Sequence, residues 1–218
     1  MTDARGADLG LQCFTRPEVG APLSREHFHQ PEVVDLLPYR KPSGGLWTST
    51  WDDRFGSAWV QWCVSEEFRC PPDSVWADVW LLKAKRDARV FVIDSYRDLA
   101  ELVERYPHRA LAPSYVPRRD ITPHWLKVAS DYDAVSLTDA GQSSTHLSYP
   151  LDLYGWDCES TLWLRWMFES VERIEPRAFA VVEALRRDVL PVRWVNPSDD
   201  KPLRGAEIPK SAKRAFQL

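Results

Sequence analysis

Two short segments far apart in the chain carry side chains that could together bind and activate a sugar. Residues 44–50 read Gly-Gly-Leu-Trp-Thr-Ser-Thr, and residues 154–160 read Tyr-Gly-Trp-Asp-Cys-Glu-Ser. Alternate side chains of a strand share a face, so Asp157 and Glu159 would lie side by side. Paired carboxylates can bind a ribose diol and can stabilise positive charge on an anomeric carbon as its leaving group departs. A simpler interpretation stays open, in which one carboxylate caps a turn and the other is solvated.

The first segment contains the residue types expected in a surface that binds a flat ligand. Gly44 and Gly45 lack a Cβ, so the backbone there can adopt a positive φ or approach a ligand closely. Trp47 would present an indole face, and the hydroxyls of Thr48 and Ser49 would point to opposite sides of the strand. The alternative is a glycine turn that leads into an ordinary strand.

These residues resemble motifs of the ADP-ribosyltransferases. Residues 45–49, followed by the Ser-Ala-Trp-Val-Gln-Trp-Cys run at 57–63, resemble a segment of the poly(ADP-ribose) polymerase catalytic domain. The Thr-Ser-Thr triplet at 48–50 resembles the Ser-Thr-Ser strand of the arginine-type bacterial enzymes, in which Arg16 and the Asp-x-Glu pair would have counterparts in the same order. The pattern also resembles uncharacterised actinobacterial and phage proteins that carry Tyr-Gly-Trp-Asp-Cys.

The resemblance implies a split β-sheet that holds NAD in an extended cleft and transfers ADP-ribose to an acceptor, or hydrolyses NAD. Glu159 would be the catalytic carboxylate that stabilises an oxocarbenium-like transition state, and Asp157 or Tyr154 would position the ribose or the acceptor. The residues expected to bind NAD are Arg16, Gly44, Gly45, Trp47, Thr48, Ser49 and Tyr154. The acceptor itself is not indicated. The competing hypothesis is a non-catalytic binding or interaction module that uses the same cleft for a nucleotide or a protein partner.

The elements that must position these residues alternate irregularly, which favours an α+β fold over a regular βαβ arrangement. We expect a split, mixed or antiparallel sheet flanked by short helices. The connection at 85–88 predicts a hairpin or a short crossing. The polar segment 138–149 predicts a mobile loop, which either covers a site or is a surface loop without a functional role. Expected strands are 11–16, 45–50, 74–84, 89–94, 133–137, 160–166 and 168–174, and expected helices are 31–37, one capped by Ser57, 96–106, 122–132 and 177–189.

The domain organisation expected from the sequence is simple. Residues 1–10 predict a flexible leader, residues 11–195 a single α+β domain, and residues 196–218 a weakly basic, partly disordered tail. A chain of 218 residues with 44% hydrophobic content can bury a sizeable core. Neither a dinucleotide-binding Gly-x-Gly-x-x-Gly motif nor a P-loop is present.

Composition narrows the functional classes. The net charge of −4 does not indicate nucleic-acid binding, and no apolar run is long enough for a membrane span. Four dispersed cysteines without a Cys-x-x-Cys pair predict reduced thiols in a cytoplasmic protein, and no spacing predicts a metal site. The 11 tryptophans predict either a bulky core or stacking surfaces for rings and sugars.

Overall fold

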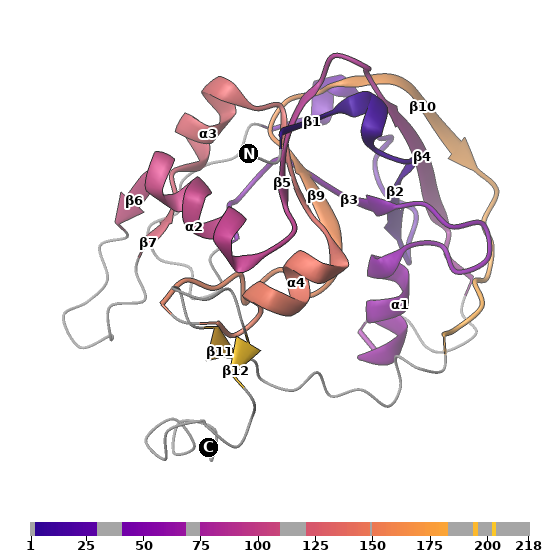
Figure 1. Ribbon diagram of the computed structural model, residues 1–218. Coiled ribbons are helices and arrows are strands. Elements are labelled where there is room, and N and C mark those ends of the chain that lie inside the picture. Colours follow the sequence, from indigo (N-terminus) through magenta and orange to yellow (C-terminus); the bar gives the residue numbers. More distant parts are fainter. Residues whose placement is uncertain are drawn as a thin grey trace.

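The computed structural model describes residues 3–29, 41–68, 75–109, 121–148, 150–182, 194–195 and 202–203 (Figure 1). Its helices are α1 (Ala58–Ser65), α2 (Tyr96–Arg105), α3 (Trp125–Asp131) and α4 (Asp139–Thr145), with short 3₁₀ turns at Gly6–Asp8 and Arg25–His27. Its strands are β1 (Asp3–Arg5), β2 (Gln12–Arg16), β3 (Leu46–Thr50), β4 (Asp78–Ala84), β5 (Arg89–Ile93), β6 (Pro107–Arg109), β7 (Ile121–Pro123), β8 (Ala134–Leu137), β9 (Ser160–Trp163), β10 (Phe168–Ile174), β11 (Trp194–Val195) and β12 (Pro202–Leu203). The fold is α+β, as expected.

Eight of these strands form one mixed sheet in the order β1-β5-β8-β9-β3-β2-β4-β10. The β5–β8 pair is parallel, and the other neighbouring pairs are antiparallel. Residues 85–88 join β4 to β5, although these strands lie near opposite ends of the sheet. Such a short connection is a crossing rather than a hairpin, and it requires the two halves of the sheet to curl toward each other.

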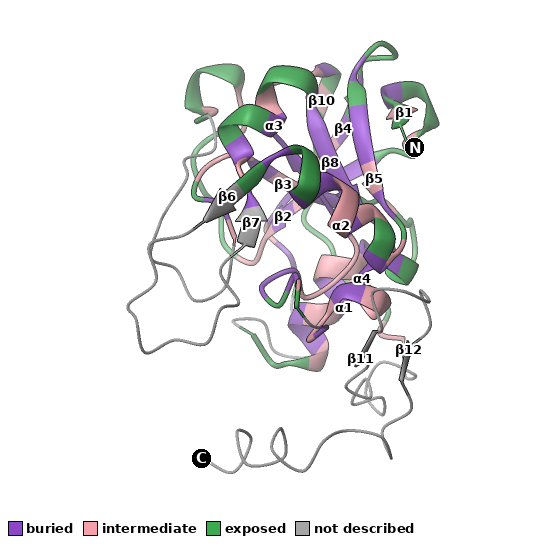
Figure 2. Ribbon diagram, turned by 60° about the vertical axis from the view of Figure 1, so that its left-hand side comes forward, coloured by how far each residue is buried: buried purple, intermediate pink, exposed green. Residues whose placement is uncertain are grey.

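The curled halves enclose one apolar core and carry helices on the other face. Leu82 of β4, Val90 of β5 and Trp163 of β9 belong to the same buried cluster, which therefore lies between the halves. On the opposite face, α2 and α3 pack on β5, β8 and β9, whereas α1 packs on β2 and β4. Figure 2 shows exposed residues along the outer sides of α2 and α3. On this face, the junction of β2 and β3 therefore lies between the core under α2 and α3 and the separate core under α1.

Local sequence signals account for the elements that match the expectation. Ser57 caps α1 by accepting a hydrogen bond from the Val60 N–H, and Ser95 with Asp98 forms the capping box of α2. The strands β2, β3, β5, β8 and β10 lie within one residue or so of their expected bounds at each end. The expected helix at 31–37 lies outside the described residues.

Residues 138–149 were expected as a mobile loop, but Asp139–Thr145 form helix α4. Thr138 accepts a hydrogen bond from the Gly141 N–H at 3.0 Å and so caps the helix. The Thr145 hydroxyl donates to the Gly141 carbonyl at 2.8 Å, and both Gln142 and Thr145 are buried. Capping and tertiary burial therefore override the weak helix propensity of this polar segment.

Three other expectations differ from the structure because main-chain groups find tertiary partners. The helix predicted from 122 begins at Trp125, since residues 121–123 pair with β6. The described part of the helix predicted at 177–189 is not helical: Arg177 bridges to Trp76, and the Val182 N–H donates to Gln61 at 2.9 Å. Residues 3–5, expected in a flexible leader, form β1 and pair with β5.

The proposed tail at 196–218 lies outside the described residues except for β12, which pairs with β11. No helix in the described segments has the length and apolar character needed to cross a membrane.

Candidate functional site

The sheet splits between β2 and β3. Within these two fully described strands, pairing is limited to Gln12 with Thr50 and Cys13 with Ser49. The rest of β2 follows β4, whereas residues 46–48 follow β9. The two strands therefore diverge like the arms of a V and leave an opening in the middle of the sheet.

Main-chain polar groups face this opening. The Trp51 N–H donates to the Leu11 carbonyl at 2.7 Å, which makes the pair at the closed end of the V a hydrogen-bonded one. Hydrogen-bonded and non-hydrogen-bonded pairs alternate along an antiparallel ladder. The main-chain groups of Thr15 and Trp47, each four residues along its strand from the Leu11–Trp51 pair, therefore point across the opening where no ladder partner meets them.

A cavity of about 380 Å³ occupies the opening. One wall comes from β2 and the facing wall from β3, and the segment before β9 closes one end. The described lining residues are Cys13, Phe14, Thr15, Arg16, Lys41, Trp47, Thr48, Ser49, Trp59, Asp157, Cys158 and Ser160. The structure thus brings together five of the residues selected from the sequence, namely Arg16, Trp47, Thr48, Ser49 and Asp157.

Glu159 sits at the closed end of the V. Its carboxylate accepts hydrogen bonds from the Thr50 N–H at 3.1 Å and the Thr50 hydroxyl at 3.0 Å. The Ser49 hydroxyl donates to the Glu159 carbonyl at 2.9 Å. Side chains thus continue the contact between β3 and the start of β9 after the main-chain ladder ends. Burial raises the pKa of Glu159 to about 7, and the bonds from Thr50 oppose that rise.

The Glu159 side chain is outside the set of described residues that line the cavity, although Asp157, Cys158 and Ser160 belong to it. Residues 48 and 161 are directly paired, so Thr50 and Glu159 continue that register on one face. The carboxylate consequently lies beside the cavity, against Thr50.

Asp157 lies in the cavity wall close to a lysine. The Lys41 ammonium is 3.8 Å from the Asp157 carboxylate and 4.8 Å from the centre of the Trp47 ring. Burial raises the pKa of Asp157, while Lys41 and His146 oppose the rise. Burial lowers the pKa of His146, and the nearby carboxylates of Asp157 and Asp152 oppose that change. The cavity therefore holds a partly desolvated carboxylate whose charge is balanced by Lys41.

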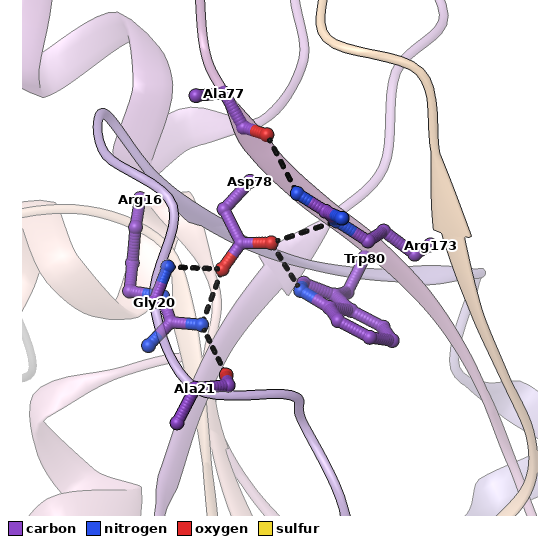
Figure 3. A network of polar contacts seen from close by, with 7 residues as sticks. All are labelled: Arg16, Gly20, Ala21, Ala77, Asp78, Trp80 and Arg173. Carbon is purple, nitrogen blue, oxygen red and sulfur yellow. Dashed lines mark hydrogen bonds and ion pairs between the residues drawn. The ribbon is translucent and has the colours of Figure 1, made fainter.

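Arg16 is held by a buried carboxylate (Figure 3). Its guanidinium donates to Asp78, which is 1% exposed, and Asp78 also accepts from Arg173 at 3.1 Å and from the Trp80 indole at 2.8 Å. Two guanidiniums against one carboxylate leave an excess positive charge. The Nε of Arg16 is buried and has no hydrogen-bond partner. Arg16 therefore brings positive charge to the cavity wall from a fixed position.

The remaining sequence candidates lie outside the cavity lining. Gly44 and Gly45 have φ values of +77° and +70°, so they supply the left-handed turn that leads into β3. Tyr154 is 43% exposed and stacks on His146 with ring centres 5.7 Å apart. Their observed roles are in the backbone turn and in a surface stack.

Sequence reasoning missed Thr15, Lys41 and Trp59 as lining residues. Thr15 and Arg16 are neighbours on β2, where the divergence of the strands exposes both to the cavity. Lys41 begins the Lys-Pro-Ser-Gly-Gly run, which was a usable signal, and Trp59 lies in the Ser-Ala-Trp run of α1. Nothing in the sequence indicated that β2 leaves β3 after two residue pairs.

The cysteines of the cavity are poor nucleophiles. Burial raises the pKa of Cys13 to about 12, and burial also raises the pKa of Cys158. Both thiols are therefore protonated at neutral pH. Among the described residues, no group of histidine, cysteine and acidic side chains is arranged to hold a metal ion.

Comparisons with models of known protein families, with curated proteins and with solved structures find no match to this chain.

Proposed function

We propose that this protein binds NAD in the opening between β2 and β3 and transfers its ADP-ribose to an acceptor or to water. The observation that carries the proposal is the convergence of three separate sequence motifs. One cavity is lined by Arg16, by the residues Trp47 to Ser49, and by Asp157. The Glu159 carboxylate is hydrogen-bonded to Thr50 at the end of β3.

The cavity walls suit the ring and ribose of a nucleotide. Trp47 and Phe14 provide aromatic surface, while the main-chain groups of Thr15 and Trp47 offer donors and acceptors to a planar amide. Thr15 also has a hydroxyl that is buried without a hydrogen-bond partner, and a bound polar ligand would satisfy it. These features support a ligand that is both flat and polar.

In the proposed reaction, the bond between the ribose and the pyridinium nitrogen breaks, and nicotinamide leaves with the bonding electron pair. The acceptor oxygen or nitrogen then forms a bond to the same anomeric carbon and releases its proton. Ionised Glu159 would stabilise the positive charge that develops on the sugar. With a pKa of about 7, this carboxylate is ionised in a large fraction of molecules at neutral pH. Asp157 would position the ribose or the acceptor.

The experiment is an NAD turnover assay. Purified protein is incubated with NAD, and released nicotinamide is measured by chromatography for the wild type and for Glu159→Gln. Glu172→Gln, an exposed position on β10, is the matched control. We expect turnover by the wild type and the control and loss of at least about 100-fold in Glu159→Gln. Absence of turnover in the wild type, or equal turnover in all three proteins, contradicts the enzymatic proposal.

The position of Glu159 favours one second candidate, a non-catalytic module that uses the cavity only for binding. Its carboxylate is engaged by Thr50 beside the cavity rather than in its lining. A ligand at 100 times its dissociation constant stabilises the folded state by about 2.7 kcal/mol. A raised melting temperature in millimolar NAD without nicotinamide release would therefore identify a nucleotide-binding module. An unchanged melting temperature in millimolar NAD would favour an interaction module over a protein that binds NAD.

A further inference from the structure

A second cavity, of about 680 Å³, adjoins the first. It lies between the end of β2, the loop that follows β2, and helix α1. Its described lining includes Thr15 and Arg16 of β2, Glu18 and Gly20 of the loop, and the aromatic residues Trp59 and Phe68. Thr15, Arg16 and Trp59 line both cavities, so a ligand in one can continue into the other.

The junction between the cavities carries a guanidinium group. Arg16 lies there, and the carboxylate that neutralises it is shared with Arg173. Ala21 and Gly20 fix the loop to the same network, because the Ala21 carbonyl accepts from Arg16 at 2.8 Å and the Gly20 N–H points to Asp78 at 3.4 Å. A guanidinium that is held in place in this way is a suitable position for a phosphate group.

Aromatic rings form the far wall. Trp59 stacks on Trp62 with ring centres 5.0 Å apart and an angle of 17°. Phe68 approaches Trp59 at 6.1 Å and Trp62 at 5.3 Å, and it is 40% exposed. Partly exposed aromatic rings beside a cavity are surfaces on which nucleobases stack.

A buried hydroxyl without a partner gives an independent sign of a ligand. Thr15 is 6% exposed and lines both cavities, yet its Oγ1 makes no hydrogen bond. An unsatisfied buried hydroxyl costs free energy, so a residue of this kind is expected where a ligand supplies the missing partner.

We infer that the second cavity binds the purine base of a nucleotide whose phosphates lie at Arg16. The base stacks on the aromatic wall of Trp59 and Phe68, and Thr15 hydrogen-bonds the base or its ribose. This inference rests on the proposed function only in placing a nucleotide in the groove, and it does not require any transfer reaction. It makes purine nucleotides ligands in their own right.

The first test is a titration series followed by tryptophan fluorescence and calorimetry. The probes are adenosine monophosphate, uridine monophosphate and ribose 5-phosphate, which share a phosphate and differ in the base. We expect adenosine monophosphate to bind about tenfold or more tightly than ribose 5-phosphate because of base stacking. Uridine monophosphate should be intermediate, since its ring is smaller. Equal affinity for all three probes overturns the inference.

The second test uses variants that remove one feature each. Phe68→Leu should weaken adenosine monophosphate about tenfold or more while leaving ribose 5-phosphate unchanged. Phe55→Leu is the matched control, because Phe55 is a half-buried aromatic residue outside both cavity linings. Thr15→Val should weaken the nucleotide and raise the melting temperature of the free protein, since it removes the unsatisfied hydroxyl. A merely structural Thr15 would give a lower melting temperature.

The outcomes separate this inference from the transfer reaction. Purine binding that Phe68→Leu weakens, without release of nicotinamide from NAD, supports the second cavity and removes the proposed transfer. The opposite result is release of nicotinamide with a KM for NAD that Phe68→Leu leaves unchanged, together with no inhibition by adenosine monophosphate. That result supports the transfer reaction and overturns the purine site in the second cavity.

Discussion

Replacing Glu159 by glutamine should make the protein more stable at high pH. Burial raises the pKa of Glu159 from an ordinary value of 4.5 to about 7. Between these pH values the folded state binds more protons than the unfolded state, so this group lowers stability as the pH rises through that window. The full shift corresponds to about 3 kcal/mol, and partial solvent exposure reduces the expected effect to about 1–2 kcal/mol.

Glutamine is neutral and keeps an oxygen that can accept the hydrogen bonds of Thr50. The melting temperature of Glu159→Gln relative to the wild type should therefore be nearly unchanged at pH 4.5 and higher by about 2–8 °C at pH 8. The assay is thermal unfolding in matched buffers across this pH range, with Glu172→Gln as the exposed control. A difference that is independent of pH, or a wild type that is the more stable at pH 8, would refute the reasoning.

The same carboxylate makes a kinetic prediction if the protein turns over NAD. Because the ionised form stabilises the developing charge, kcat/KM should rise with pH through about 7 and then level off, falling about tenfold for each unit below that pH. Higher stability of Glu159→Gln together with lost turnover would mark Glu159 as a residue kept for activity at the expense of stability. A flat pH profile would exclude Glu159 as the ionised group.

Three further substitutions test the framework of the site by chemical denaturation. Thr48→Val should cost about 2–4 kcal/mol, because the Thr48 hydroxyl joins two buried side chains, among them the Trp163 indole at 2.9 Å; a loss below 1 kcal/mol would contradict this. Asp78→Asn should lower the free energy of unfolding by about 2–3 kcal/mol and weaken nucleotide binding, since it removes the carboxylate that holds two guanidiniums. A variant that is as stable as the wild type at both low and high salt would contradict this role of the network. Gly141→Ala should destabilise by about 1–3 kcal/mol instead of gaining helix propensity, because its Cβ would lie 2.0 Å from the Ile93 carbonyl, and a stabilised variant would show that α4 can move away.

Some of the fold follows from local chemistry alone. Ser57 and the Ser95–Asp98 box determine where two helices begin, and Gly44 with Gly45 determines the left-handed turn before β3. These signals act over three or four residues, so they can be read from sequence. The α+β class follows in the same way from the irregular succession of such elements.

Other parts depend on partners that are distant in sequence. Helix α4 forms in a polar segment because its buried side is packed in the fold, and residues 177–182 stay extended because their main-chain groups bind near Trp76 and Gln61. Local propensity carries no record of such contacts.

The same distinction between local signals and long-range contacts applies to the candidate site. The local sequence specifies which side chains are available: a glycine turn, an aromatic strand with hydroxyls, and the carboxylates Asp157 and Glu159. Long-range packing makes β2 leave β3 after two residue pairs, which creates the cavity, and it brings Glu159 against Thr50 beside the cavity. It also placed Thr15 between two cavities. Strand divergence depends on how β4 and β9 draw their neighbours apart, and that competition exists only once the whole sheet has formed.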